Sequence, residues 1–351
     1  MPIEAKFPSR TPRAVVLGCA GERLSAEERR FFTEADPLGF VLFRRNCKTP
    51  DQLRALVAEF REAVGRADAP VLIDQEGGRV ARLQPPHWRA YPAPARIAAL
   101  PDPLAAEAAS LGARLIADDL AALGITVDAI PVLDLPVPGA DAVIGDRAYG
   151  SAPERVARLG RAVCEGALAG GVLPIIKHIP GHGRALVDSH RALPRVAAER
   201  AVLTASDFAP FRALAAMPWA MTAHIVYEAI DAAAPSTFSR QVIDDIIRGE
   251  IGFDGVLISD DLSMGALAGG LGERTRRALD AGCDLALHCN GVLAEMEEVA
   301  EAAAPLSPQA QTRVARGEAL RRASRQEFDR AAAEARFAEL LGQTASTGAH
   351  V

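Results

Sequence analysis

The stretch "LPIIKHIPGHGRALVDSH" (residues 173–190) begins as an apolar run and ends in charged and imidazole side chains. Its first part (173–176) has the continuous hydrophobicity of a strand buried on both faces, as in a parallel sheet covered by helices. Lys177 and His178 stand where the apolar run ends, and glycines, an aspartate and two more histidines follow them. The fold therefore has to collect polar groups at the end of a buried strand.

Seven other apolar runs of the same kind recur along the chain, separated by amphipathic stretches. Two of these stretches, 25–35 and 49–65, begin with Ser25 and Thr49, which are good N-terminal caps for helices. Eight strands that alternate with helices predict a (β/α)8 barrel. The seven further runs are "AVVLGCA" (14–20), "GFVLF" (39–43), "PVLIDQE" (70–76), "VDAIPVLDL" (127–135), "WAMTAH" (219–224), "GVLISDD" (255–261) and "CDLALHCN" (283–290).

Polar residues at the C-terminal ends of these runs favour the barrel over an open sheet. In a barrel all of these ends open onto one face, where the active site is built. An open doubly wound sheet, the alternative that the pattern leaves open, would gather them only at its switch point. The residues concerned are Asp74, Glu76, Asp134, Lys177, His178, His224, Asp260, Asp261, His288 and Asn290.

We therefore expect a single catalytic α/β domain of the TIM-barrel type. The barrel should occupy about residues 14–304 and carry extra helices at 305–341, which we expect to pack outside it. The last segment, "GQTASTGAHV" (342–351), is typical of a frayed tail.

Composition restricts the partners and the compartment. The formal net charge of −6 argues against a nucleic-acid partner, which usually selects a basic surface. Five cysteines without paired spacing indicate reduced thiols in a cytoplasmic protein. Glycine and proline break the apolar run 167–176, and the apolar run before Cys19 is too short for a signal-peptide core, so we expect no membrane segment.

Two loops carry residues suited to holding a polar ligand. In "DQEGGRVARL" (74–83), Asp74 and Arg82 can form strong directed hydrogen bonds, although a loop salt bridge explains them equally well. In "VIGDRAYG" (143–150), Arg147 is suited to clamp a ligand, and the alternative is a structural pair with an aspartate. Neither loop has the spacing of a phosphate-binding or dinucleotide-binding motif.

Adjacent aspartates end the seventh run in "SDDLSMGA" (259–266). Because neighbouring side chains cannot both point the same way, we expect Asp260, nearer the strand, to face the pocket. Its neighbour would then cap the following helix, whose N-terminus favours negative charge. The alternative is that both carboxylates are caps.

The polar residues of the opening stretch admit three interpretations. Lys177 at a strand end is suited to form a Schiff base. In a second interpretation, Lys177 and His178 bind substrate while Asp188 orients His190 as a general acid/base, and the intervening glycines let that pair swing over the substrate. The third is a metal site, for which the spacing of the residues fits no zinc signature; its ligands would be His178, His182, Asp188 and His190.

Five motifs, in their order and spacing, resemble the bacterial β-N-acetylhexosaminidases of glycoside hydrolase family 3, the NagZ type. The resemblance covers roughly residues 14 to 300. It implies a retaining exo-glycosidase that removes terminal β-linked N-acetylglucosamine, chiefly from anhydro-muropeptides (GlcNAc-anhydroMurNAc, with or without peptide) in cell-wall recycling. The motifs are "DQEGGRV" (74–80), "GDRAYG" (145–150), "KHIPGHG…DSH" (177–190), "MTAHIVY" (221–227) and "SDDLSMGAL" (259–267).

The resemblance also implies residue roles. Asp260 matches the nucleophile that forms the glycosyl-enzyme intermediate, and His190 matches the general acid/base, with Asp188 tuning it. A histidine in place of the usual second carboxylate suits the task because it titrates near neutral pH. No metal and no organic cofactor is implied. The positions that match sugar-binding residues are Asp74, Arg82, Arg147, Lys177 and His178.

Two other functions remain as alternatives to this one. A broader β-glycosidase of the same family would use a glutamate from a second domain in place of the histidine of "DSH". A sugar-binding barrel without catalysis would be expected to have lost Asp260 or His190, and both are present. The sequence departs from the family at Ile179, where phenylalanine is usual, and this change should alter packing rather than chemistry.

Overall fold

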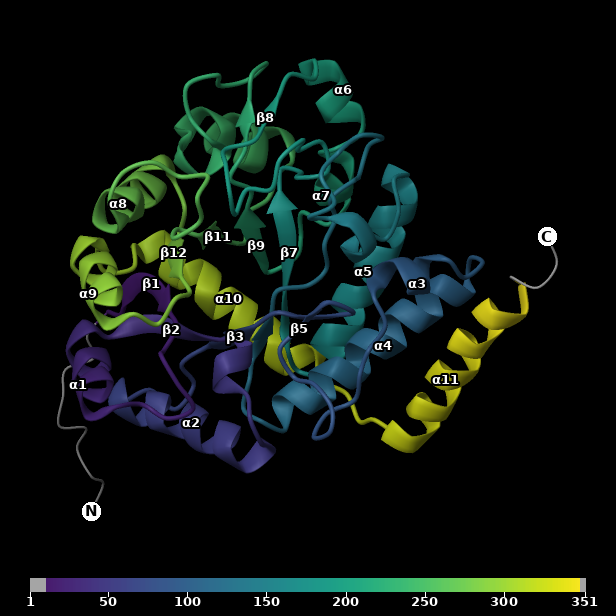
Figure 1. Cartoon of the computed structure of the whole chain (residues 1–351), viewed down its shortest axis with the longest axis horizontal. Helices are drawn as coiled ribbons and strands as arrows, with labels where there is room; N and C mark the ends of the chain where they lie inside the picture. Colours follow the sequence, from purple (N-terminus) through teal and green to yellow (C-terminus); the bar gives the residue numbers. More distant parts are fainter. Residues whose placement is uncertain (1–10, 348–351) are drawn as a thin grey trace.

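Eight parallel strands close into one barrel in the computed structural model, which describes residues 11–347 (Figure 1). The strand order around the barrel is β1-β12-β11-β9-β7-β6-β3-β2, so neighbours in sequence are neighbours in the sheet. Every predicted run contributes one strand, and the barrel, not the open sheet, is confirmed. The strands are β1 (Arg13–Leu17), β2 (Pro37–Leu42), β3 (Val71–Ile73), β6 (Val127–Asp128), β7 (Leu173–Ile179), β9 (Trp219–Thr222), β11 (Val256–Asp261) and β12 (Leu285–His288).

Helices follow the strands and cover the outside of the barrel (Figure 1). Both predicted N-caps form: the hydroxyls of Ser25 and Thr49 accept from the backbone N–H of Glu28 and Gln52. The helices are α1 (Ala26–Ala35), α2 (Pro50–Ala63), α3 (Pro94–Ala98), α4 (Leu104–Ala121), α5 (Pro153–Ala169), α6 (Arg200–Ala205), α7 (Ala209–Ala213), η4 (Val242–Glu250), α8 (Leu271–Ala281), α9 (Leu293–Ala302), α10 (Pro308–Ser324) and α11 (Arg330–Thr347).

The loops that connect the barrel strands and helices contain several short strands and single-turn helices. Strands β4 (Gln75–Gly77) and β5 (Val80–Ala81) form an antiparallel pair, and β8 (Arg195–Val196) pairs in parallel with β10 (Val226–Tyr227). Single-turn helices are η1 (Arg44–Asn46), η2 (Gly145–Arg147) and η3 (Ser236–Phe238). Within the described residues, no helix is long and apolar enough to span a membrane.

The barrel interior is a packed apolar core that receives side chains from every strand. Along β7 and β11, Ile175 and Ile258 belong to this inner cluster, whereas their neighbours Ile176 and Leu257 pack in the outer cluster beneath the helices. Because side chains alternate along a strand, the residue two positions further on returns to the inner side. This alternation directs Lys177 and Asp260 into the mouth of the barrel. The inner cluster includes Val16, Val41, Leu72, Val127, Ile175, Met221, Ile258 and Leu287.

Helix α10 lies against the N-terminal ends of the strands, opposite the mouth. A Cβ atom added to Gly317 would lie 3.2 Å from Nε1 of Trp219, which begins β9, so helix and strand touch closely. Arg313 of the same helix pairs with Asp284 at 2.9 Å. The part of the extension that α10 forms therefore closes one end of the barrel.

Helix α11 packs beside α4 on the outside of the barrel (Figure 1). The ring of Phe337 fills the space beside Gly112, and Arg336 pairs with Glu107 at 2.7 Å. The expectation of a tail at 342–351 is wrong for its first residues, because α11 continues to Thr347. Residues 348–351 lie outside the described residues.

Candidate active site

Charged side chains from β3, β7 and their loops form one network at the C-terminal ends of the strands. Lys177 lies at its centre: its Nζ is 2.9 Å from Oδ1 of Asp74 and 2.7 Å from Oε1 of Glu76. Arg82 donates to Asp74 at 2.7 Å, and Arg147 donates two hydrogen bonds to Glu76, at 2.8 and 2.9 Å. The structure thus brings together four predicted sugar-binding residues and a carboxylate, Glu76, that the sequence had only placed at a strand end.

Burial divides this network into an outer and an inner part. The side chains of Asp74 and Arg82 are 20% and 23% exposed, so both can meet a ligand. Glu76, in contrast, is 1% exposed and is covered by its two cationic partners. Breaking a buried pair from one side leaves an uncompensated charge, so Arg147 also stabilises the buried Glu76.

Electrostatics argue against Lys177 as a Schiff-base nucleophile. Burial alone would lower the pKa of Lys177, but the negative charges of Asp74 and Glu76 hold that pKa above its ordinary value. In return, burial would raise the pKa of Asp74, but Lys177 and Arg82 hold it well below its usual range. An amine must be neutral to attack a carbonyl, so this lysine is suited to hydrogen bonding and not to covalent catalysis.

His178 is held by a buried carboxylate that the predicted set of site residues omits. Asp134, with no exposed surface, accepts from Nδ1 of His178 at 2.6 Å, and from the backbone N–H of His178 and of His182 at 3.2 and 2.6 Å. With Nδ1 bound to a carboxylate, the ring can present Nε2 to a ligand. Burial would raise the pKa of Asp134, but His178 beside it holds the pKa below its ordinary value.

The two neighbouring aspartates of β11 have separate surroundings. Asp261 is used by the fold: its carboxylate accepts from the backbone N–H of Ser263 at 3.0 Å, from the Ser263 hydroxyl at 2.7 Å and from the Cys289 N–H at 3.3 Å. The Asp260 carboxylate accepts from the Asp261 N–H at 2.8 Å. Burial would raise the pKa of Asp260, but His178 and His224 nearby hold it below its ordinary value. Asp260 is therefore a carboxylate at neutral pH, and within residues 11–347 its second oxygen accepts no hydrogen bond and is left to react.

His190 and Asp188 pair as the sequence predicted. Nδ1 of His190 lies 2.8 Å from Oδ1 of Asp188, and that oxygen also accepts the His190 backbone N–H at 2.9 Å. Burial would raise the pKa of Asp188, but these bonds from His190 lower it, so the carboxylate stays charged. The His190 ring is 64% exposed, so a ligand at the mouth of the barrel can reach it.

The glycines at the exit of β7 let the backbone pack closely against neighbouring segments. A Cβ atom on Gly183 would lie 2.0 Å from the carbonyl oxygen of Leu135, and one on Gly181 would lie 3.1 Å from Cβ of Asp207. Both residues are buried. This close packing gives no support to the expectation that these glycines let the Asp188–His190 pair swing. The exposed part of the segment begins later, at Leu186 and Val187, which are 66% and 41% exposed.

His182 belongs to this buried exit and not to a ligand set. Its Nε2 lies 3.0 Å from Oγ of Ser189, and burial lowers its pKa to about 4, so the ring is neutral at physiological pH. His224 is likewise buried, between Thr237 and the Asp261 carbonyl. Among residues 11–347 there is no group of three or more His, Cys, Asp or Glu side chains suited to hold a metal ion.

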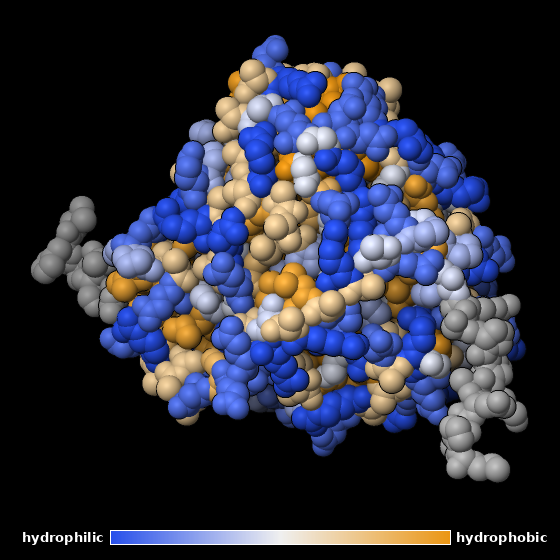
Figure 2. All heavy atoms as spheres, turned by 180° about the vertical axis from the view of Figure 1, so that it is seen from behind, coloured by the Kyte–Doolittle hydropathy of each residue, from blue (hydrophilic) through white to orange (hydrophobic). Residues whose placement is uncertain are grey.

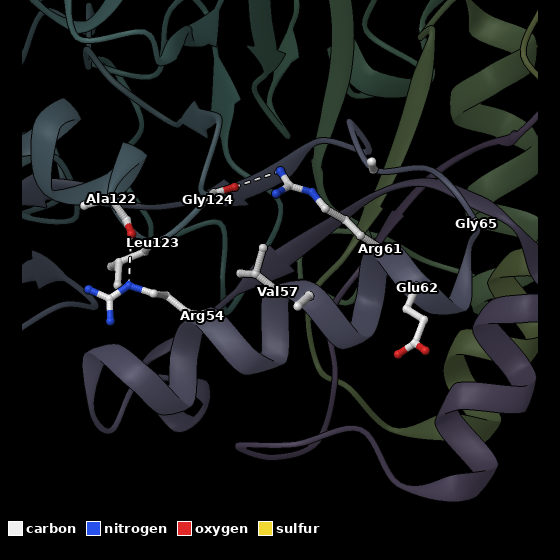
Figure 3. Close-up of a pocket in the computed structure, with 10 residues that line it drawn as sticks. Arg54, Val57, Arg61, Glu62, Gly65, Ala122, Leu123 and Gly124 are labelled. Carbon is white, nitrogen blue, oxygen red and sulfur yellow. Dashed lines mark hydrogen bonds between the residues drawn. The ribbon is translucent and has the colours of Figure 1, made fainter.

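A separate hollow of about 590 Å³ lies on the outside of the barrel, between α2 and the loop at 122–124 (Figure 3). Two arginines reach across it, but both are engaged: Arg61 donates to the Gly124 carbonyl at 2.8 Å and Arg54 to the Ala122 carbonyl at 3.1 Å. This hollow carries none of the strand-end residues, so we do not regard it as the site.

Comparison with known proteins agrees with the geometry at the mouth of the barrel. Residues 13–317 match the glycosyl hydrolase family 3 N terminal domain. The chain belongs to glycoside hydrolase family 3. A beta-hexosaminidase of Alkalilimnicola ehrlichii is 43% identical over 283 residues, which are 79% of this chain and 80% of the relative. A beta-hexosaminidase of Pseudomonas aeruginosa is 40% identical over 280 residues, 79% and 82% of the two chains.

Solved structures of the family share the fold. NagZ from Neisseria gonorrhoeae, solved in complex with N-trifluoroacetyl-D-glucosamine, superposes with a TM-score of 0.84 at 34% identity, covering 95% of this chain and 100% of that chain. The family resemblance and the TIM-type barrel expected from the sequence are thereby confirmed.

Proposed function

We propose that this family 3 enzyme is a retaining exo-β-N-acetylglucosaminidase that releases N-acetylglucosamine from anhydro-muropeptides during peptidoglycan recycling in the cytoplasm. The β-N-acetylhexosaminidase class follows from relatives that are 40–43% identical over about four fifths of both chains. One observation supports the mechanism: half-buried Asp260 lies near the end of β11 at the barrel mouth, and the loop that follows this strand binds the backbone of Ser189 and His190 in the exposed acid/base segment.

In the first step, the Asp260 carboxylate attacks the anomeric carbon of the terminal sugar while His190 donates its Nε2 proton to the leaving oxygen. The glycosidic bond breaks and a glycosyl ester of Asp260 forms. In the second step, neutral His190 takes a proton from water, which attacks the same carbon and frees the carboxylate. Asp188 stabilises the imidazolium and keeps Nδ1 protonated, so that Nε2 faces the sugar in both steps.

Three members of the charged network hold the sugar. Asp74 accepts hydrogen bonds from sugar hydroxyls, and Arg82 and Lys177 donate to hydroxyl or acyl oxygens. His178, fixed through Nδ1 by Asp134, offers Nε2 to the same ring. Because Lys177 is 2% exposed, its ammonium group is reached only from inside the mouth, which suits a single terminal sugar and hence exo action.

Turnover of paired chromogenic substrates tests the proposal. The kcat/KM for a nitrophenyl β-N-acetylglucosaminide should be at least about 100-fold higher than for the matching β-glucoside. The glucoside lacks the acetamido group, so it leaves polar groups of the site without a partner. Release of N-acetylglucosamine from GlcNAc-anhydroMurNAc would support exo cleavage. If NMR shows that the sugar first released has the β configuration, the reaction proceeds with retention. Equal kcat/KM values for both glycosides would indicate the broader β-glycosidase. A lack of turnover would indicate a sugar-binding barrel without catalysis.

A further inference from the structure

The segment that carries the acid/base pair, here termed the acid/base arm (residues 184–192), is docked on the loop that follows the nucleophile. The backbone N–H of Ala266 donates to the carbonyl oxygen of Ser189 at 3.0 Å, and that of Gly265 donates to the carbonyl oxygen of His190 at 3.2 Å. These two bonds join the carbonyl groups on either side of the His190 Cα atom to the loop that follows β11, the strand that carries Asp260.

The loop that receives the arm is itself firmly fixed. Asp261 binds Ser263 through its carboxylate and ties the loop to Cys289 beyond β12. Leu262 donates its N–H to the Leu287 carbonyl at 2.9 Å, and the Arg274 guanidinium of α8 binds the Leu262 carbonyl at 2.7 Å. A loop held on three sides offers a defined position to whatever binds its free N–H groups.

Gly265 leaves no room for a side chain between this loop and the arm. A Cβ atom there would lie 2.8 Å from the His190 oxygen and 3.1 Å from the Arg191 oxygen, and both are backbone atoms that cannot rotate away. The backbone of Gly265 is outside the left-handed region, so alanine meets no conformational penalty of its own. Its effect would fall on the position of the arm.

A third contact docks the arm from the opposite side. Oγ of Ser189 lies 3.0 Å from Nε2 of His182, and both residues are buried although the flanking His190 is exposed. Ser189 is therefore the point at which the arm is anchored, between the barrel exit and the loop after the nucleophile. The catalytic ring projects from this anchor.

We propose that Gly265, with Ala266, is a positioning residue that sets the place of His190 relative to Asp260, by binding the arm through backbone N–H groups and by lacking a side chain. This rests on the proposed function, because it assigns to the docked arm the proton transfers of the retaining mechanism. Displacing the arm should impair protonation of the leaving group while leaving the nucleophile and the sugar-binding network intact.

Gly265→Ala tests this on two substrates of different leaving-group acidity. On an alkyl or disaccharide substrate, kcat/KM should fall at least about 10-fold, since general acid catalysis contributes about 100- to 10,000-fold. On a 2,4-dinitrophenyl glycoside, whose leaving group needs no proton, kcat/KM should fall less than about 3-fold. The pH profile of kcat/KM should also shift on the first substrate only.

Gly21→Ala is the matched control, because a Cβ atom there meets nothing within 4 Å. Ser189→Ala is the second variant: it removes the His182 bond, keeps the backbone, and should show the same substrate-selective loss even if Gly265→Ala folds poorly by circular dichroism. Equal losses on both substrates in both variants, or no loss in either, would overturn the positioning role. Wild-type enzyme without activity on any N-acetylglucosaminide would instead refute the proposed function.

Discussion

Asp260 and Asp261 are neighbours in the chain, but their carboxylates have different hydrogen-bond partners. Asp261 is occupied by Ser263 and Cys289, whereas Asp260 has an oxygen free for the sugar. Asp260→Asn should reduce kcat at least about 1,000-fold, as loss of a catalytic nucleophile does. Asp261→Asn should instead lower the melting temperature and reduce kcat far less, because it loosens the loop on which the arm docks.

A fluorinated sugar distinguishes the two carboxylates directly. A 2-fluoro or 5-fluoro glycosyl donor should leave a stable ester on Asp260 of the wild-type enzyme, located by mass spectrometry of a peptide digest. A label on Asp261 would contradict the assignment.

Arg82 and Arg147 are both cationic candidates from the sequence, yet the structure predicts different consequences for their loss. Arg82→Ala removes a half-buried donor beside Asp74 and should raise KM more than it lowers kcat. Arg147→Ala leaves Glu76 buried with one partner fewer, at a cost of about 3–5 kcal/mol of folding free energy. Thermal unfolding should thus separate the variants, with a large decrease in melting temperature for Arg147→Ala alone. Equal melting temperatures would show that Glu76 does not depend on Arg147.

In the acid/base arm and the strand exit before it, the sequence predicted one contact correctly and did not reveal others. The Asp188–His190 spacing predicted a pair that the structure shows at 2.8 Å, since two residues of separation lets the carboxylate reach Nδ1. The function of Gly181 and Gly183 was not predictable, because it depends on contacts with Asp207 and Leu135, which the folded chain alone brings near. Glu76 and Asp134 were missed as supports for the same reason: their partners Arg147 and His178 are far away in sequence.

His190→Ala should affect substrates according to their leaving groups. For nitrophenyl or dinitrophenyl glycosides, kcat/KM should change little, whereas for GlcNAc-anhydroMurNAc it should fall about 100- to 10,000-fold, the usual contribution of a general acid. Without its base the variant should accumulate the glycosyl ester, so kcat falls even for good leaving groups. Azide, which needs no deprotonation, should attack the anomeric carbon, restore kcat and yield a glycosyl azide. Equal loss on all substrates without azide rescue would show that His190 is not the acid/base.

The barrel holds two kinds of carboxyl group near its mouth: some have lowered pKa values, and one has a raised pKa. Asp134 and Asp260 have pKa values below the ordinary range, so they contribute stability that is present above about pH 4 and is lost as the pH falls. Asp128, in β6, behaves in the opposite way. It is fully buried, Oδ1 accepts the Gln75 N–H at 2.9 Å, Oδ2 has no hydrogen-bond partner among the described residues, and burial raises its pKa to about 8.

Asp128 should therefore make the folded chain less stable as the pH rises. Between about pH 4 and 8 the folded state keeps the Asp128 proton and the unfolded state releases it, so the free energy of unfolding falls by up to about 1.4 kcal/mol per pH unit from this group. Asp128→Asn cannot titrate, and its stability relative to the wild type should rise from pH 5 to pH 8 in urea unfolding. Asp51→Asn, at a side chain that is 95% exposed, controls for the loss of one negative charge. A constant difference in unfolding free energy between Asp128→Asn and the wild type across this range would mean that Asp128 is already charged in the folded barrel, held there by Lys177.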